Sequence, residues 1–160
     1  MLKGAVDIQV KLDELHKTAD DPLWLNARNA WIRALAPTTV GRIGEELALK
    51  VLGGNQTKNN TVGYDIELED QRIEVKLSTV INNDGRPIFI WRQIRPADPY
   101  TDICFVAVYP NKTRMFLVPR ERIPIEVLKP GHGRNGSLDI FQIHTRRIDD
   151  LFPWMVDHEL

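Results

Sequence analysis

The stretch at residues 62–78, VGYDIELEDQRIEVKLS, decides the fold that the sequence predicts. Apolar and polar residues alternate strictly in residues 64–68 and again in residues 72–78, on either side of a polar break at residues 69–71. This period-two pattern indicates two antiparallel strands joined by a tight turn. The apolar residues of both strands then share one face of the hairpin.

Three charged side chains gather on the other face of this hairpin, because residues i and i+2 of a strand point the same way. One register pairs Ile66 with Ile73. Asp65 then faces Glu74, with Lys76 as its diagonal neighbour. A register shifted by two residues opposes Asp65 to Lys76 instead. Either register keeps the three charges together, as a salt-bridged surface patch or as a metal site.

A helix is predicted upstream over residues 38–52, TTVGRIGEELALKVL. Thr38 or Thr39 can cap its start, and the glycines at 53–54 can end it. At about 100° per residue, its core stripe consists of Ile43, Leu47 and Val51.

Of the two neighbouring glutamates in this helix, only Glu46 has a surface explanation, because it lies four residues before Lys50 on the wet face. Glu45 falls between Leu49 and Leu52. A carboxylate at the margin of an apolar face is costly unless a cation or a hydrogen-bond donor meets it. Glu45 is therefore a third candidate carboxylate.

The order of these features resembles the PD-(D/E)XK nuclease superfamily, which has the restriction-endonuclease-like fold. Glu45 stands in a GRIGEE helix, Asp65 follows a glycine and a tyrosine, and residues 74–76 supply the Glu-x-Lys element nine residues on. Tyr64 stands where a proline would precede the aspartate in the family pattern. The combination is more specific than the short Glu-x-Lys element alone.

The resemblance covers about residues 38–118, which would be the catalytic core of a single domain over residues 1–160. Residues 1–36 would form an N-terminal helical segment and residues 119–160 C-terminal elements. The fold implied is α/β, with a mixed β-sheet flanked by helices.

The same resemblance implies a metal-dependent DNA endonuclease. Asp65, Glu74 and the main-chain carbonyl of Val75 would present oxygen ligands to Mg²⁺, with Mn²⁺ as a substitute. Lys76 would orient or deprotonate the attacking water, or stabilise the charge that develops on the phosphate. Glu45 would bind the metal through water or complete a second site. No organic cofactor is expected.

A sequence-specific, homodimeric restriction-type endonuclease acting on double-stranded DNA is the first reading, because cutting both strands at a symmetric site needs two active sites. Three alternatives stay open: a structure-selective nuclease such as a Holliday-junction resolvase or a nuclease toxin, a catalytically inert DNA-binding domain of the same fold, and an unrelated α/β domain with solvated hairpin charges.

Charge is unevenly distributed along a chain of net charge −1. Residues 86–147 contain 11 basic and 5 acidic residues, and nine of the basic ones are arginines. Arginine suits phosphate and guanine, so this half is compatible with a DNA channel as well as with a solvated surface. The candidate DNA contacts are Arg92, Arg95, Arg114, His132, Arg134 and Asn135. The last three lie in GHGRNG, which can also be a plain surface loop.

Composition is that of one ordinary domain of 160 residues. The lone cysteine, Cys104, lies in the apolar run ICFVAVY, which indicates a buried structural thiol rather than a nucleophile. No segment resembles a cleaved signal, and none approaches the roughly 18 apolar residues of a membrane span. We therefore expect a cytoplasmic protein without membrane contact.

Weaker patterns cover the N-terminal segment. Residues 5–19 fit both a strand and a helical stripe, and we favour a helix. Residues 22–36 are predicted as a second helix, with proline at its first position. Trp24 and Trp31 would then lie on nearly the same side, for core or interface packing or for contact with DNA or a second subunit.

Residues 88–94, IFIWRQI, cannot be assigned, because short apolar runs fit both helices and strands. Gln93 in this run is similar in position to a glutamine that supports the site in some members of the superfamily, so it is an accessory candidate. The other expected elements are a turn-rich loop at 81–86, a buried central strand at 103–109, its neighbour at 115–118, a short helix within 119–128, an edge strand at 138–144 and a closing helix in 148–160.

Overall fold

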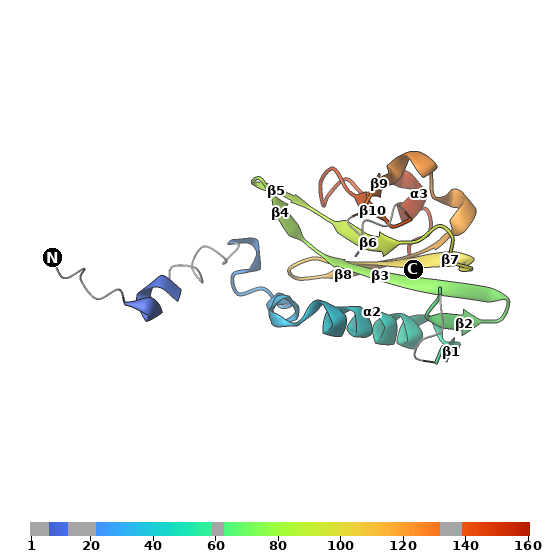
Figure 1. Cartoon of the computed structure of the whole chain (residues 1–160), viewed down its shortest axis with the longest axis horizontal. Coiled ribbons are helices and arrows are strands. Elements are labelled where there is room, and N and C mark those ends of the chain that lie inside the picture. The colour runs from blue at the N-terminus through green and yellow to red at the C-terminus, as the bar shows by residue number, and fades with distance from the viewer. Residues whose placement is uncertain (1–6, 13–21, 59–62, 132–138) are drawn as a thin grey trace.

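The computed structural model describes residues 7–12, 22–58, 63–131 and 139–160 (Figure 1). Within them, the main sheet is mixed, with five strands in the order β1-β2-β3-β7-β8. These are β1 (Asn55–Gln56), β2 (Ile66–Leu68), β3 (Gln71–Thr79), β7 (Asp102–Val108) and β8 (Thr113–Pro119). The predicted α/β class and mixed sheet are confirmed.

The hairpin adopts the first of the two expected registers, with Ile66 opposite Ile73 in the antiparallel pair β2–β3. Strand β3 then runs parallel to β7, and β8 returns antiparallel to β7. Every residue of β7 is buried, which confirms the central strand predicted at residues 103–109.

Helix α2 (Pro37–Leu52) covers one face of the main sheet, and a second, smaller sheet covers the other (Figure 1). The second sheet has the order β6-β10-β9, from β6 (Ile90–Ile94), β10 (Phe141–His144) and β9 (Leu128–Pro130). The closing helix predicted in the C-terminal tail is α3 (Pro153–Val156). The expectation of a sheet flanked by helices therefore holds for one face, and strands take the place of a long helix on the other.

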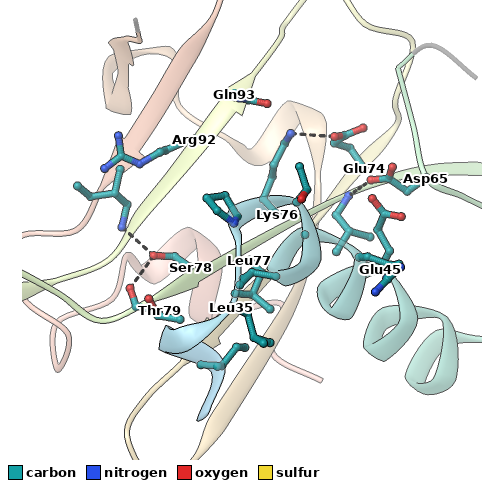
Figure 2. Close-up of a pocket in the computed structure, with 18 of the residues that line it drawn as sticks. Leu35, Glu45, Asp65, Glu74, Lys76, Leu77, Ser78, Thr79, Arg92 and Gln93 are labelled. Atoms are coloured by element: carbon teal, nitrogen blue, oxygen red, sulfur yellow. Dashed lines mark hydrogen bonds and ion pairs between the residues drawn. The ribbon is translucent and has the colours of Figure 1, made fainter. Parts of the chain in front are cut away.

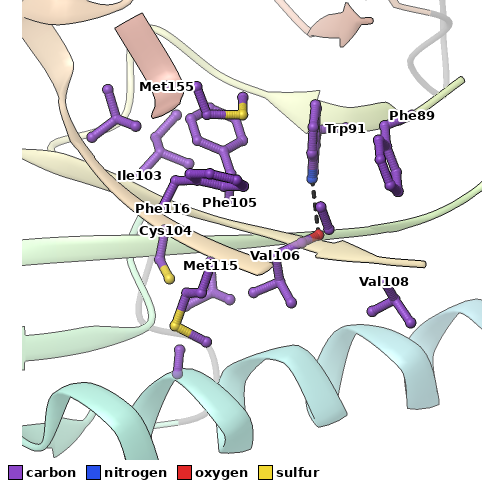
Figure 3. Close-up of a cluster of buried hydrophobic side chains, with 14 of the residues drawn as sticks. Phe89, Trp91, Ile103, Cys104, Phe105, Val106, Val108, Met115, Phe116 and Met155 are labelled. Atoms are coloured by element: carbon purple, nitrogen blue, oxygen red, sulfur yellow. Dashed lines mark hydrogen bonds between the residues drawn. The ribbon is translucent and has the colours of Figure 1, made fainter. Parts of the chain in front are cut away.

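An aromatic cluster joins the two sheets (Figure 3). Trp91 of β6 packs against Phe105 of β7, with ring centroids 5.4 Å apart, and its indole N–H donates to the Val106 carbonyl at 3.1 Å. Phe89, the residue between β5 (Arg86–Ile88) and β6, stacks on Trp91 with ring centroids 5.5 Å apart. Cys104 is fully buried on the α2 side of the main sheet, and burial raises its pKa to about 12, as expected for an unreactive thiol.

Helix α2 has nearly the predicted bounds but a different cap. Pro37 is the first helical residue and Ala36 is the N-cap, with no side-chain hydrogen bond at the cap. The prediction that Thr38 or Thr39 caps the helix is therefore wrong, because proline at the first helical position moves the start by one residue. Gly53, with φ of 78°, ends the helix as predicted.

The buried face of α2 also differs from the predicted stripe. Val51 is 54% exposed, whereas Gly44 and Ala48 are buried. A Cβ on Gly44 would lie only 3.1 Å from the Cβ of Leu77 on β3. The helix therefore contacts the sheet through its smallest residues, because these allow the closest approach of the two backbones.

Residues 22–36 form two 3₁₀ turns, η1 (Pro22–Trp24) and η2 (Ala30–Ala34), and not the predicted helix. Trp24 is buried and Trp31 is 56% exposed, so the two rings do not share a side. The Asn29 side chain donates to the Tyr109 carbonyl at 2.9 Å, which ties this segment to the end of β7 instead of letting it continue as a helix. Residues 8–12 are helical, and most of the predicted helix at 5–19 lies outside the described residues.

Several other expectations also change. Residues 81–88 contain a second hairpin of β4 (Ile81–Asn83) and β5 (Arg86–Ile88). Residues 119–128 form the 3₁₀ turns η3 (Arg120–Arg122) and η4 (Ile125–Val127). Strand β10 pairs on both sides, so it is not an edge strand. Within the described residues, no helix is long and apolar enough to cross a membrane.

Candidate functional site

The side chains of Glu45, Asp65, Glu74 and Lys76 meet where β2 begins (Figure 2). Strand β2 starts at Ile66, so the β2–β3 ladder stops before Val75. The Val75 N–H therefore lacks a partner from β2, and the Asp65 carboxylate accepts its hydrogen bond at 2.8 Å. The Asp65 side chain thus supplies the hydrogen-bond acceptor that a neighbouring strand would supply at this open edge of β3.

The site wraps around this edge of the sheet. Val75 and Leu77 contact Gly44 of α2, so they face the helix. Lys76 pairs with Phe105 and points to the same side as that ring, which packs against β6. Glu45 consequently approaches the edge from the helix side, while Lys76 and Glu74 approach it from the β6 side (Figure 2).

Two close contacts connect these four side chains. The Lys76 ammonium lies 2.9 Å from a Glu74 carboxylate oxygen, and both side chains are largely buried. The carboxyl groups of Glu45 and Asp65 also interact directly, which adds to the rise in the pKa of Asp65 and offsets part of the rise in the pKa of Glu45.

Burial is the main cause of the perturbed pKa values in the site. It raises the pKa of Asp65 to about 6, against the lowering effect of the hydrogen bond from the Val75 N–H. Burial and then the Glu74 charge raise the pKa of Glu45. Burial also raises the pKa of Glu74, with Lys76 opposing it. The site therefore holds three carboxyl groups close together, although burial disfavours their charged forms and the charges repel one another.

The donor chemistry of the site fits a hard divalent cation, which prefers carboxylate oxygens. A bound cation would offset both the burial and the mutual repulsion that raise these pKa values. In the described part of the chain, no three Asp, Glu, His or Cys side chains converge closely enough to hold a metal ion as they stand. Glu74 pairs with Lys76 through one carboxylate oxygen, so its other oxygen is the donor that it could offer to a metal ion.

A groove of about 700 Å³ runs from this site along the open edge of β3. Helix α2 and the turn η2 line one side of it, and β6 lines the other (Figure 2). Its acidic residues are the three carboxylates Glu45, Asp65 and Glu74. Its basic residues are Arg33, Arg42, Lys76, Arg92 and Arg95. The groove thus combines an acidic end with cationic walls, which suits an anionic ligand.

Three of the predicted nucleic-acid or accessory residues reach this groove, namely Arg92, Gln93 and Arg95. Arg114 does not line it: its guanidinium makes a bidentate pair with Glu159, with both contacts at 2.8 Å. The remaining predicted contacts lie outside the described residues; they are His132, Arg134 and Asn135.

A β-bulge turns Arg92 and Gln93 toward the groove. Between two pairs with β10, strand β6 has one residue more than its partner. Trp91 and Ile94 are both buried, and the two polar residues between them are both exposed. Strict alternation would bury one of the two. Gln93 has φ of 56°, a conformation that costs energy in a non-glycine residue and is enriched at functional sites.

Two groove arginines were not among the predicted site residues. Arg42 lies three residues before Glu45 on the groove side of α2, and helical spacing could have identified it. Arg33 could not be found from spacing, because it lies in the 3₁₀ turn η2, where a regular helix was predicted. Its guanidinium lies 5.2 Å from the centre of the Trp24 ring, so a cation–π contact holds it at the groove wall.

No family model matches the chain, and the search of curated proteins gives no significant match. The functional interpretation therefore depends on the residues of this site and on the chemistry that they permit.

Proposed function

We propose that the protein is a metal-dependent endonuclease with a restriction-endonuclease-like fold, acting on double-stranded DNA as a cytoplasmic homodimer. The observation that supports this most is the meeting of Glu45, Asp65, Glu74 and Lys76 at one end of a groove with arginines on both walls. A salt-bridged surface patch would not need three partly buried carboxyl groups with raised pKa values. The order of α2, the β2–β3 hairpin and a strand parallel to β3 agrees with the same fold.

In this proposal, Asp65, Glu74 and the Val75 carbonyl hold Mg²⁺, with Mn²⁺ as a substitute, and Glu45 assists directly or through water. The Val75 carbonyl is a suitable donor because it points to the same side of β3 as the Val75 N–H, away from β7. When bound, the ion supplies Lewis acidity and a more acidic water.

Lys76 has two roles that its ion pair with Glu74 makes possible. The pair holds the ammonium group beside the carboxylates, where it can orient the attacking water or stabilise charge on the phosphate. Arg92 and Arg95 on the β6 wall would bind phosphates of the DNA backbone. Gln93, which the bulge exposes on the same wall, would also contact the DNA.

Cleavage of a panel of labelled DNAs in Mg²⁺ tests this function. The panel contains a duplex, the matching single strand and a four-way junction, each with EDTA and Lys76→Ala controls. We expect cleavage that EDTA and Lys76→Ala both abolish. Near-normal cleavage by a folded Lys76→Ala protein would refute the assigned role of the lysine.

The substrate profile separates the nuclease alternatives. Cleavage of the junction alone would favour a structure-selective enzyme, and discrete duplex products would favour a restriction enzyme. Calorimetric titration with Mn²⁺ tests the inert DNA-binding alternative. Absence of Mn²⁺ binding together with binding of uncut DNA would replace the nuclease proposal with that alternative.

A further inference from the structure

Helix α2 contains two glycines, Gly41 and Gly44, and the structure explains only one of them. Glycine inside a helix is destabilising relative to alanine. Gly44 is buried, and a Cβ there would lie 3.1 Å from Leu77. Packing of the helix on β3 therefore accounts for Gly44.

Gly41 has no such explanation among the described residues. A Cβ at this position would meet nothing within 4 Å, and the backbone has an ordinary helical φ. Gly41 is exposed and lines the groove. Neither packing nor backbone conformation requires glycine here, so alanine would fit and would stabilise the helix.

The position of Gly41 in the groove indicates that a ligand approaches the backbone of α2 there. It lies one helical turn before Glu45, about 6 Å along the axis, on the helix face that lines the groove. Arg42 follows it in the chain, and Arg42 and Arg33 of η2 both line the groove. Glycine is the residue that lets a ligand approach the backbone most closely.

The flanking charges indicate the chemistry of that ligand. Arg33 is held against the Trp24 ring, so little side-chain freedom is lost when it binds. Arg42 makes no ion pair with a carboxylate of the described residues, and none of the acidic groove residues lies N-terminal to Glu45 on α2. Two arginines beside an open stretch of helix favour a phosphate group.

We propose that the bound nucleic-acid strand passes over Gly41, where its sugar–phosphate backbone approaches α2 closely between Arg33 and Arg42. The phosphate next to the scissile one binds there, one helical turn from Glu45. This inference rests on the proposed nuclease function, and it assigns the helix side of the groove as the path of the cut strand.

Substitutions that enlarge residue 41 distinguish an effect on the stability of the fold from an effect on DNA binding. Gly41→Ala and Gly41→Leu are compared with the full-length wild type by thermal unfolding and by fluorescence anisotropy. The probes are a fluorescein-labelled duplex and its single strand, with Ca²⁺ in place of Mg²⁺ to limit cleavage. Val51→Leu is the matched control, because Val51 is exposed on the same helix and outside the groove.

We expect Gly41→Ala to raise the melting temperature by about 1 to 4 °C and to weaken binding about tenfold. Gly41→Leu should weaken binding about 100-fold, while Val51→Leu binds as the wild type does. Arg33→Ala and Arg42→Ala should each reduce the slope of log K against log salt concentration by about 1, and Arg122→Ala, outside the groove, should not.

Two results would overturn the inference while leaving the nuclease proposal intact. One is a Gly41→Leu protein that binds and cleaves like the wild type. The other is a lower melting temperature for Gly41→Ala, which would show that the fold itself needs the glycine. If the wild type binds neither probe and cleaves neither, the proposed function fails, and this inference fails with it.

Discussion

Replacing Asp65 with asparagine should stabilise the metal-free protein at neutral and alkaline pH. Burial raises the pKa of Asp65 from 3.8 to about 6, so ionisation of this carboxyl group costs more in the folded than in the unfolded state. At 1.36 kcal/mol per pKa unit, the cost is about 3 kcal/mol when the group is ionised in both states. Asparagine removes the charge, keeps an acceptor for the Val75 N–H and offers a donor to Glu45.

The pH dependence follows from the sign of this shift. The folded state binds the proton more tightly, so the contribution of Asp65 to stability is greatest below pH 3.8 and decreases as the pH rises through about 6. The advantage of Asp65→Asn over the wild type should be complete at about pH 8 and fall to roughly half near pH 5.

Thermal unfolding at several pH values measures this effect. For a chain of this length, about 3 kcal/mol corresponds to a rise of about 6 to 12 °C in melting temperature. Glu46→Gln is the control, because Glu46 is exposed on the same helix and should shift stability by less than about 0.5 kcal/mol. Mg²⁺ should stabilise the wild type more than Asp65→Asn. A lower melting temperature for Asp65→Asn at pH 8 would refute the reasoning, because it would make the carboxylate a structural group.

Three further predictions concern the same site. Lys76→Ala should reduce cleavage at least about 100-fold without unfolding the protein, which single-turnover assays and circular dichroism measure together; equal cleavage by wild type and variant would contradict it. At low Mg²⁺ concentration, cleavage should fall below about pH 6 as Asp65 takes up its proton, and the midpoint should move to lower pH as Mg²⁺ is added; a midpoint independent of Mg²⁺ would exclude this competition. Gly63→Ala should destabilise the fold by about 2 kcal/mol or more, because φ is 102° and the new Cβ would lie 2.3 Å from Pro99. Gly85→Ala, also at positive φ but in open space, should cost less in urea unfolding, and equal costs would show that the contact with Pro99 does not matter.

The hairpin and its charged face could be predicted from the sequence because their pattern is local. Alternation around Ile66 and Ile73 specifies which side chains share a face, and the observed register is one of the two expected. The position of Glu45 near the margin of the apolar face of its helix likewise indicated a carboxylate without a surface explanation. The four candidate residues meet in one site because α2 and the hairpin, separated only by β1, lie close together in the chain and pack on each other.

The walls of the groove could not be predicted, because they depend on contacts between distant residues. The segment around Arg33 has a helical pattern, but Asn29 ties it to the Tyr109 carbonyl and leaves 3₁₀ turns. Strand β6 reaches its place through Trp91 packing on Phe105 and through pairing with β10, whose paired residues lie 47 to 54 positions further along the chain. Neither the bulge at Gln93 nor the open space over Gly41 has a signal in sequence spacing.

Incubation of supercoiled plasmid with the purified protein and Mg²⁺ tests the central claim most directly. Wild type, Glu74→Ala and an EDTA control are run in parallel on a gel, after unfolding curves establish that the variant is folded. The account predicts nicked or linear products from the wild type with Mg²⁺ alone. Products that persist in EDTA or with folded Glu74→Ala, or no cleavage by the wild type with either Mg²⁺ or Mn²⁺, would contradict it.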